Sequence, residues 1–237
     1  MIDSYIVFDI ETTGLYPKTD RIIEIGGVKV VHDKVVDTFH TLIDPGMELP
    51  KHIIDLTGIQ PSMLEDAPKT SEAVGQFIEF CEDYILVGHN VIFDYSFVKR
   101  YAVNHKLPFE RQGIDTLKIA RKVLPWLEKK NLESLCSYYK IDQGNKHRAL
   151  DDAQSTKQLL DKLRDDFLVD HEECFKPYDL IYKVKREGPI TSAQKGYLND
   201  LIKYHKIKLD VDIDTLTKNE ASRRIDHIIL KHGRIIR

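Results

Sequence analysis

A strand-like run near the N-terminus constrains the fold of this chain more than any other feature. Residues 4–10 read Ser-Tyr-Ile-Val-Phe-Asp-Ile, and they end at the acidic, glycine-containing stretch 11–14. A β-branched and aromatic run bounded by a turn predicts a buried strand. Two further apolar runs, residues 21–31 and 34–43, are joined by the polar pair His32–Asp33 as in a hairpin. The chain is therefore predicted to begin with an antiparallel meander that carries carboxylates at the end of its first strand.

Helix and strand patterns alternate after this meander. Apolar residues recur at helical spacing over residues 73–84 and 91–104, on either side of the short apolar run 85–88. This order predicts a right-handed crossover connection onto the same sheet. Residues 45–68, punctuated by proline and glycine, are expected to form a loop. The remaining elements expected of this part are a short strand at 113–116 and helices at 117–124, 132–139 and 148–167.

The fold class indicated by these elements is α/β, with a mixed β-sheet flanked by helices and a small C-terminal helical appendix. Two Ser/Thr-x-x-Glu/Gln capping boxes, Thr191–Gln194 and Thr217–Glu220, each precede an amphipathic run and predict the two helices of the appendix. A stretch without clear periodicity lies before them. The expected division is a domain of residues 1–170, a connector of residues 171–189 and a small basic helical module of residues 190–237.

Composition is that of a soluble globular protein. Of the 237 residues, 42% are hydrophobic, which is enough to bury a core. The three cysteines, an odd number without close spacing, are typical of reduced thiols rather than of a disulfide framework. The N-terminus lacks the pattern of a signal peptide, and no apolar run approaches the ~18 residues that span a bilayer. We therefore expect a cytoplasmic protein with no membrane partner.

The near-neutral total charge hides two parts of opposite sign. The formal net charge is −3, which alone argues against a strongly basic nucleic-acid-binding protein. Residues 183–237, however, hold 13 basic and 7 acidic residues, a net of +6, while residues 1–182 carry −9. Both a solvated helix face and contact with a nucleic-acid backbone explain the basic segment. The total charge therefore does not argue against nucleic acid as a ligand.

Carboxylates gather at the ends of the predicted elements. Asp9 and Glu11 are two apart on the first strand, so both project from one face at the end of an apolar segment. Like charges ~4 Å apart in a partly buried site repel by about 4 kcal/mol, and a divalent cation is their natural partner. Asp94 falls in the first turn of a predicted helix, and His147 and Asp152 bracket the start of another. Solvated acids, a helix-start acid and a surface histidine are the alternative interpretations of these positions.

Three segments of the sequence, taken together and in their order along the chain, resemble the motifs of a known family. They read Asp9-Ile-Glu-Thr-Thr-Gly-Leu15, His89-Asn-x-x-x-Asp94 and His147-Arg-Ala-Leu-Asp-Asp152. They resemble the exonuclease motifs of the DEDDh (DnaQ-like) 3′→5′ exonucleases, a family similar to the epsilon-like proofreading exonucleases of replicative DNA polymerases. The resemblance extends over residues 4–165 and implies a ribonuclease H-like fold, which agrees with the mixed sheet predicted above.

By this resemblance the chain would be a hydrolase that releases nucleoside 5′-monophosphates from the 3′ end of a nucleic acid, DNA rather than RNA. Two divalent cations, Mg²⁺ or Mn²⁺, would be held by Asp9, Glu11, Asp94 and Asp152. His147 would be the general base, since a neutral imidazole is available at physiological pH. The activity would serve proofreading, repair or end trimming, with a DNA polymerase or a repair protein as partner.

The resemblance also implies contacts with the terminal nucleotides. These would come from Thr12, Thr13, Leu15, His89, Asn90 and Phe93, with Leu15 as an apolar wedge against a base. Turn formation by the threonines and core packing by Phe93 are the alternative roles. Two other functions also stay open. One is an exoribonuclease of the same fold, and the other is a nucleic-acid-binding or polymerase-associated subunit whose exonuclease activity is secondary.

Overall fold

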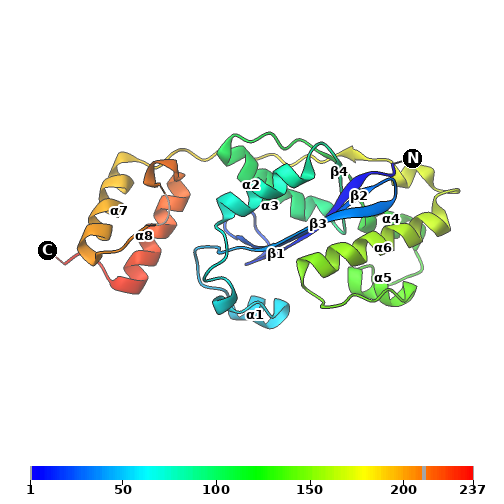
Figure 1. Cartoon of the computed structure of the whole chain (residues 1–237), viewed down its shortest axis with the longest axis horizontal. Coiled ribbons are helices and arrows are strands. Elements are labelled where there is room, and N and C mark those ends of the chain that lie inside the picture. The colour runs from blue at the N-terminus through cyan, green and yellow to red at the C-terminus, as the bar shows by residue number, and fades with distance from the viewer. Residues whose placement is uncertain (1, 210–211, 237) are drawn as a thin grey trace. The chain divides into compact units, whose positions relative to one another are not determined.

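The computed structural model describes residues 2–209 and 212–236, which form two compact units (Figure 1). The larger unit extends to Lys183 except for Val103–Lys106, and the smaller unit contains those residues and the chain from Val184 onward. Residue 1 of the predicted domain and residues 210, 211 and 237 of the predicted basic module lie outside the described residues. Each unit has a hydrophobic core of its own.

A mixed six-stranded sheet forms the centre of the larger unit. Its strands are β1 (Tyr5–Thr12), β2 (Ile22–Val31), β3 (Lys34–Leu42), β4 (Ile85–Gly88), β5 (Gln112–Asp115) and β6 (Tyr178–Asp179). They lie in the order β3-β2-β1-β4-β5-β6. β1 pairs antiparallel with β2 and parallel with β4. The predicted α/β class with a mixed sheet is confirmed, and the predicted hairpin joins β2 to β3.

Helices cover both faces of this sheet (Figure 1). α2 (Thr70–Cys81) and α3 (Val91–His105) cover one face, and α4 (Thr116–Val123), α5 (Leu132–Tyr139) and α6 (Ala149–Phe167) cover the other. α1 (Lys51–Thr57) packs in a smaller separate cluster. Successive side chains of β1 enter different cores, because side chains alternate along a strand. Phe8 shares a core with Phe77 of α2 and Val98 of α3. Val7 belongs to the core on the other face, with Leu160 of α6.

The loop expected over residues 45–68 is interrupted by α1 and by a 3₁₀ turn at Pro61–Met63, so this prediction is wrong for those residues. Pro50 is extended at the start of α1, and Gly58 ends the helix with a left-handed φ of 71°. Ile53 is buried in a small cluster with Ile23 and Ile59. A helix of seven residues is too short to display a clear apolar period, which explains why the pattern does not reveal it.

The first part of the expected connector packs on the larger unit. Glu172–Phe175 form a 3₁₀ turn, and the following Tyr178–Asp179 form the edge strand β6. The backbone N–H of Leu180 donates to the carbonyl of Arg111 at 2.9 Å, and its side chain is buried in the core on the Phe8 face of the sheet. The larger unit accordingly ends at Lys183.

The smaller unit is built on α7 (Ser192–His205) and α8 (Lys218–His232), with a 3₁₀ turn at Ile213–Thr215 between them. Both capping boxes are formed, with Thr191 at the start of α7 and Thr217 at the start of α8. The buried core of this unit consists of Leu198, Leu201, Leu216, Ala221, Ile225 and Ile228. Among the residues described for either unit, no helix is both long and apolar enough to cross a membrane.

Candidate active site

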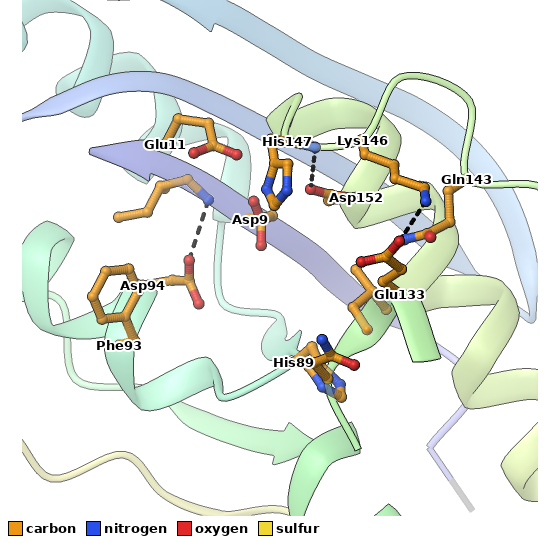
Figure 2. Close-up of a pocket in the computed structure, with 13 residues that line it drawn as sticks. Asp9, Glu11, His89, Phe93, Asp94, Glu133, Gln143, Lys146, His147 and Asp152 are labelled. Carbon is orange, nitrogen blue, oxygen red and sulfur yellow. Dashed lines mark hydrogen bonds and ion pairs between the residues drawn. The ribbon is translucent and has the colours of Figure 1, made fainter. Parts of the chain in front are cut away.

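A pocket opens beside the carboxyl end of β1, where the three sequence motifs meet (Figure 2). Its walls come from β1, the first turns of α3 and α5, the loop before α6 and α6 itself. These elements are far apart in the sequence, so the pocket exists only because the sheet and the helices on it are assembled.

β1 and α3 contribute three carboxylates to the pocket. Asp9 and Glu11 lie on the same side of β1, as the alternation along a strand requires. Asp94 is buried in the first turn of α3, and its Oδ1 accepts a hydrogen bond from the backbone N–H of Ile10 at 3.2 Å. This bond ties the start of α3 to β1 at the residue between the two strand acids.

The loop before α6 and the helix itself add an imidazole and a fourth carboxylate. His147 has a left-handed backbone with a φ of 58°, and its N–H donates to Oδ2 of Asp152 at 3.1 Å. One ligand atom each of Glu11, His147 and Asp152 lies within 4.8 Å of the other two. Asp151 instead accepts two hydrogen bonds of 3.0 Å from Asn145, so it holds the loop and leaves Asp152 to the pocket.

Crowding of the four acids disfavours their ionisation in the absence of a cation. Burial and the charges of Asp94 and Glu11 raise the pKa of Asp9 well above its usual range. Burial and the Asp152 charge raise the pKa of Glu11 to about 8. Burial also raises the pKa of Asp94, and it raises that of Asp152 to about 6 against the opposing effect of His147.

The residues of the pocket fit divalent cations. Carboxylate oxygens are the ligands that Mg²⁺ and Mn²⁺ prefer, and four of them converge here. Lys146, a basic residue of the pocket wall, pairs with Glu133 at 2.6 Å instead of with the central acids. Burial is the largest cause of the raised pKa values, the charges of neighbouring acids add to it at Asp9 and Glu11, and bound cations would favour the ionised carboxylates.

The structure places Thr12, Thr13 and Leu15 beyond the pocket wall, in and after the end of β1. The hydroxyl of Thr12 donates to the carbonyl of Gly14 at 2.6 Å, and the hydroxyl of Thr13 accepts from the N–H of Arg21 at 2.9 Å. Both threonines are buried and stabilise the turn. Leu15 is 72% exposed, which leaves its side chain available to a ligand.

His89 and Phe93 line the pocket, whereas Asn90 does not. One ring nitrogen of His89 bonds the Thr116 hydroxyl at 2.9 Å and the other bonds the Lys130 carbonyl at 2.8 Å, so both nitrogens are engaged within the protein. Burial lowers the pKa of His89, which favours its neutral form. Asn90 is exposed, with a left-handed φ of 72°. Phe93 is half-buried and packs near Phe97, with ring centroids 5.2 Å apart.

Glu24 of β2 is a residue to which the motifs assign no role, although it supports the site. It is fully buried, and its carboxylate accepts from Arg148 Nη2 at 2.8 Å and from the N–H of Ala149 at 3.1 Å. Although burial raises the pKa of Glu24, hydrogen bonds from Arg148 and His40 hold it below its usual range. Glu24 thus anchors the start of α6, next to His147. Its only sequence signal is an acid inside the apolar run 22–25.

Replacing Glu24 by alanine is expected to lower the free energy of unfolding by about 3 kcal/mol, because the Arg148 guanidinium and the Ala149 N–H lose their buried acceptor. Urea unfolding in metal-free buffer measures the effect. Glu82→Ala is the matched control, since it breaks the 2.8 Å pair with Lys29 at a carboxylate that is 59% exposed and should cost less than about 1 kcal/mol. Equal losses in the two variants would contradict the anchoring role of Glu24.

The metal-free protein is expected to lose stability as the pH rises from about 4 to about 8. A carboxyl group with a higher pKa in the folded than in the unfolded chain favours the fold when protonated. That contribution to stability is fully present at a pH below the pKa of the group in the unfolded chain. It is lost as the pH rises through the folded-state pKa, which is about 6 for Asp152 and about 8 for Glu11.

The expected loss is on the order of a few kcal/mol, and added Mg²⁺ should reverse most of it because bound cations favour ionised carboxylates. Thermal unfolding across this pH range, with chelator and with Mg²⁺, measures both effects. A metal-free profile that stays flat between these pH values would contradict the raised pKa values of Glu11 and Asp152.

Residues 6–160 match the RNase_T family model, which is described as an exonuclease. Curated relatives include the DNA polymerase III PolC-type proteins of Caldanaerobacter subterraneus subsp. tengcongensis, 40% identical over 159 residues, and of Thermotoga maritima, 34% identical over 220 residues. The matched parts cover 67% and 85% of this chain but 11% and 16% of those relatives. The chain therefore spans only a small part of the length of the curated relatives.

Solved exonuclease structures share the fold. Exonuclease X in complex with 5′ overhanging duplex DNA has a TM-score of 0.56 and 26% identity, over 69% of this chain and 92% of that one. The zinc-bound complex of E. coli ExoI with single-stranded DNA has a TM-score of 0.63 and 18% identity, over 70% and 41% of the two chains. At this lower identity the likeness shows the fold alone.

The family match extends across Asp9, Glu11, Asp94 and Asp152 of the pocket and across His147. Exonucleases of this family generally depend on divalent metal ions, in agreement with the carboxylate-rich pocket. The mixed sheet with helices on both faces is also that of the ribonuclease H-like exonuclease structures. On these grounds the chain belongs to the DnaQ-like DEDD family of 3′→5′ exonucleases.

Proposed function

We propose that this chain is a divalent-cation-dependent exonuclease that hydrolyses DNA from the 3′ end and releases nucleoside 5′-monophosphates. The observation that carries the proposal is the convergence of four carboxylates and one imidazole, from β1, α3, α6 and the loop before α6, in one pocket. The similar structure of Exonuclease X contains duplex DNA, which supports DNA as the substrate.

Asp9, Glu11, Asp94 and Asp152 would hold two Mg²⁺ or Mn²⁺ ions. The charges of the other three acids all act on the carboxyl group of Asp9, so Asp9 would take part in holding these ions. When bound, such ions supply a Lewis acid for the phosphodiester and stabilise charge on the attacking and leaving oxygens. The four acids thus provide binding and orientation, and their own repulsion favours uptake of the cations.

His147 would take the proton from the attacking water. Its ring lies beside Glu11 and Asp152 in the pocket, on the side opposite Asp94 (Figure 2). The hydrogen bond from its backbone N–H to Asp152, together with the left-handed backbone, holds the ring at this place. General-base catalysis of this kind contributes typically 10²- to 10⁴-fold to a rate.

The terminal nucleotides would lie between the exposed Leu15 and the half-buried Phe93. Leu15 would act as a wedge against a base, Phe93 would pack on the 3′ nucleotide, and Thr12 and Thr13 would shape the turn beneath them. Apolar and aromatic contacts accept any base, so little base specificity is expected. Because His89 uses both ring nitrogens within the protein, we propose that it supports the pocket wall and that Asn90 contacts the substrate at the pocket mouth.

A DNA polymerase is the partner that the relatives favour. They bear the name DNA polymerase III PolC-type, and their identity to this chain reaches 40% over the matched part. We propose that the exonuclease acts beside such a polymerase in proofreading, or in repair or end trimming, in the cytoplasm.

Purified protein with Mg²⁺ or Mn²⁺ on labelled substrates tests the activity. On single-stranded DNA, a 3′ label should be released at once as a mononucleotide, whereas a 5′ label should remain on a ladder of shortened products. Duplex DNA and RNA of the same sequence complete the comparison. Initial release of the 5′ label, or no hydrolysis with either cation, would contradict the proposal, and faster hydrolysis of RNA would identify an exoribonuclease.

A further inference from the structure

The smaller unit carries a groove of about 680 Å³ that is separate from the catalytic pocket. One wall is a face of α7 with Tyr197, Lys203 and Tyr204, and the other wall is formed by Arg234 and Ile235 after α8. Tyr197 and Tyr204 are 38% and 48% exposed, although their rings are large and partly apolar. Exposed tyrosines on one side of a groove indicate a contact surface rather than part of a core.

The groove has a defined shape, because hydrogen bonding and packing hold the segment after α8 beside α7. His205 Nε2 of α7 bonds the carbonyl of Gly233 at 3.0 Å, and the rings of His205 and His232 lie 5.5 Å apart. Ile235 packs against the core of the unit. The Tyr204 ring meets His205 edge to face at 4.9 Å, which restricts the orientation of this tyrosine. The two walls therefore stay together when Tyr197 and Tyr204 face a ligand.

The charges of the groove favour a polyanion. Lys203 and Arg234 lie in its walls with a single acid, Asp200. Within residues 2–209 and 212–236, neither of these two basic side chains forms an ion pair, whereas Lys195 of the same helix pairs with Asp214. The surrounding residues 183–237 carry a net charge of +6. Unpaired cations next to exposed aromatic rings are the combination that binds single-stranded nucleic acid.

We propose that this groove binds single-stranded polynucleotide, with bases stacked on Tyr197 and Tyr204 and phosphates against Lys203 and Arg234. The choice of nucleic acid rests on the proposed exonuclease function. The groove itself is a second binding site, in the smaller unit. Stacking requires unpaired bases, so the site should prefer single strands over duplex and tolerate any base sequence.

Binding of a fluorescein-labelled oligothymidylate to the full chain, followed by fluorescence anisotropy in the presence of EDTA, tests this site. The chelator prevents hydrolysis and removes the cations that the catalytic pocket would need to accept a phosphate, so the remaining binding reports on the groove. The double variant Tyr197→Ala/Tyr204→Ala is expected to bind about tenfold or more weakly, because stacking on each ring is lost. Tyr197→Phe/Tyr204→Phe keeps the rings and should bind almost as tightly as the parent.

Reversing the charge of the two basic residues in the groove provides an independent test of the proposed phosphate contacts. Lys203→Glu/Arg234→Glu is expected to weaken binding about tenfold or more and to flatten its dependence on salt concentration, because two phosphate contacts are lost. Lys218→Glu/Lys231→Glu makes the same change of charge on α8, at residues outside the groove, and should have a much smaller effect. Circular dichroism confirms that the variants are folded.

Three results would contradict the proposed nucleic-acid site in the groove. Equal affinity of the parent and the tyrosine-to-alanine variant, equal losses in the two charge-reversal variants, or no binding by the parent in EDTA would overturn it. In the first of these cases the exposed tyrosines would have to serve contact with another protein. The labelled-substrate assay tests the exonuclease proposal separately, so failure of one proposal is distinguishable from failure of the other.

Discussion

Replacing Asp9 by alanine is expected to abolish hydrolysis of 3′-labelled DNA, with a loss of about 10³-fold or more in kcat. Asp9 lies at the centre of the acidic pocket, where the charges of Glu11, Asp94 and Asp152 all act on it. Its removal would take away one of the four proposed cation ligands, and such ions contribute several kcal/mol of charge stabilisation in the transition state. A loss of about 1.36 kcal/mol corresponds to a tenfold lower rate. Steady-state kinetics on single-stranded DNA with saturating Mg²⁺ measure the loss.

The same variant should remain folded, which separates a loss of chemistry from a loss of structure. Removing one of four mutually repelling carboxyl groups is expected to raise the unfolding temperature of the metal-free protein at neutral pH. Asp83→Ala, at an exposed acid after α2, is the matched control and should change neither activity nor stability. Wild-type activity in the purified Asp9→Ala protein would overturn the proposed metal site.

Replacing His147 by alanine is expected to slow hydrolysis by about 10²- to 10⁴-fold, the range that general-base catalysis contributes. The four carboxylates stay in place, so the affinity for a 3′ end should remain close to that of the parent. One ligand atom of His147 lies within 4.8 Å of one from Glu11 and one from Asp152, so the proposed base lies beside two of the proposed cation ligands. Single-turnover rates and binding to a non-hydrolysable 3′ end separate the two effects.

The dependence of the rate on pH provides the stricter test of His147. The pH–rate profile of the variant should differ in shape from that of the parent, because the proposed base is absent from the variant. His52→Ala, at an exposed histidine of α1, is the control and should preserve the parent profile. A profile that is unchanged in His147→Ala would exclude this residue as the base.

The proposed sites in the two units would bind a polynucleotide in different ways. The pocket of the larger unit is acidic and depends on cations to accept a phosphate, whereas the groove of the smaller unit has Lys203 and Arg234 as its own cations. Binding in the groove should therefore persist in chelator and weaken with salt, while hydrolysis should require the added cation. This contrast explains how a chain with a net charge of −3 can be suited to a polyanionic substrate.

Local sequence patterns predict most of the secondary structure but miss its shortest parts. The β2–β3 hairpin and helices such as α2 and α6 follow from apolar runs and periods that extend over eight or more residues. The seven-residue α1 and the two-residue β6 are too short for a period to be visible. Their formation depends on packing, since Ile53 of α1 and Leu180, the residue after β6, are both buried.

The residues proposed to contact the substrate show what a sequence motif alone does not predict. Phe93 and His89 line the pocket, as the order of the motifs suggests. The hydroxyls of Thr12 and Thr13, however, bond the turn after β1, and both ring nitrogens of His89 are engaged by Thr116 and Lys130. Arg21, Thr116 and Lys130 lie outside the motifs, so the motifs do not reveal these partners of Thr13 and His89.

The sequence by itself determined that Asp9 and Glu11 share one face of a strand, because side chains alternate along β structure whatever surrounds it. It also determined that Asp152 lies in the first turns of a helix preceded by His147. Only the tertiary structure decided that these groups meet. The bond from Ile10 to Asp94 joins residues 84 apart, and the bond from Arg148 to Glu24 joins residues 124 apart. Contacts over such separations arise from the packing of α3 and α6 on the sheet, which local spacing does not encode.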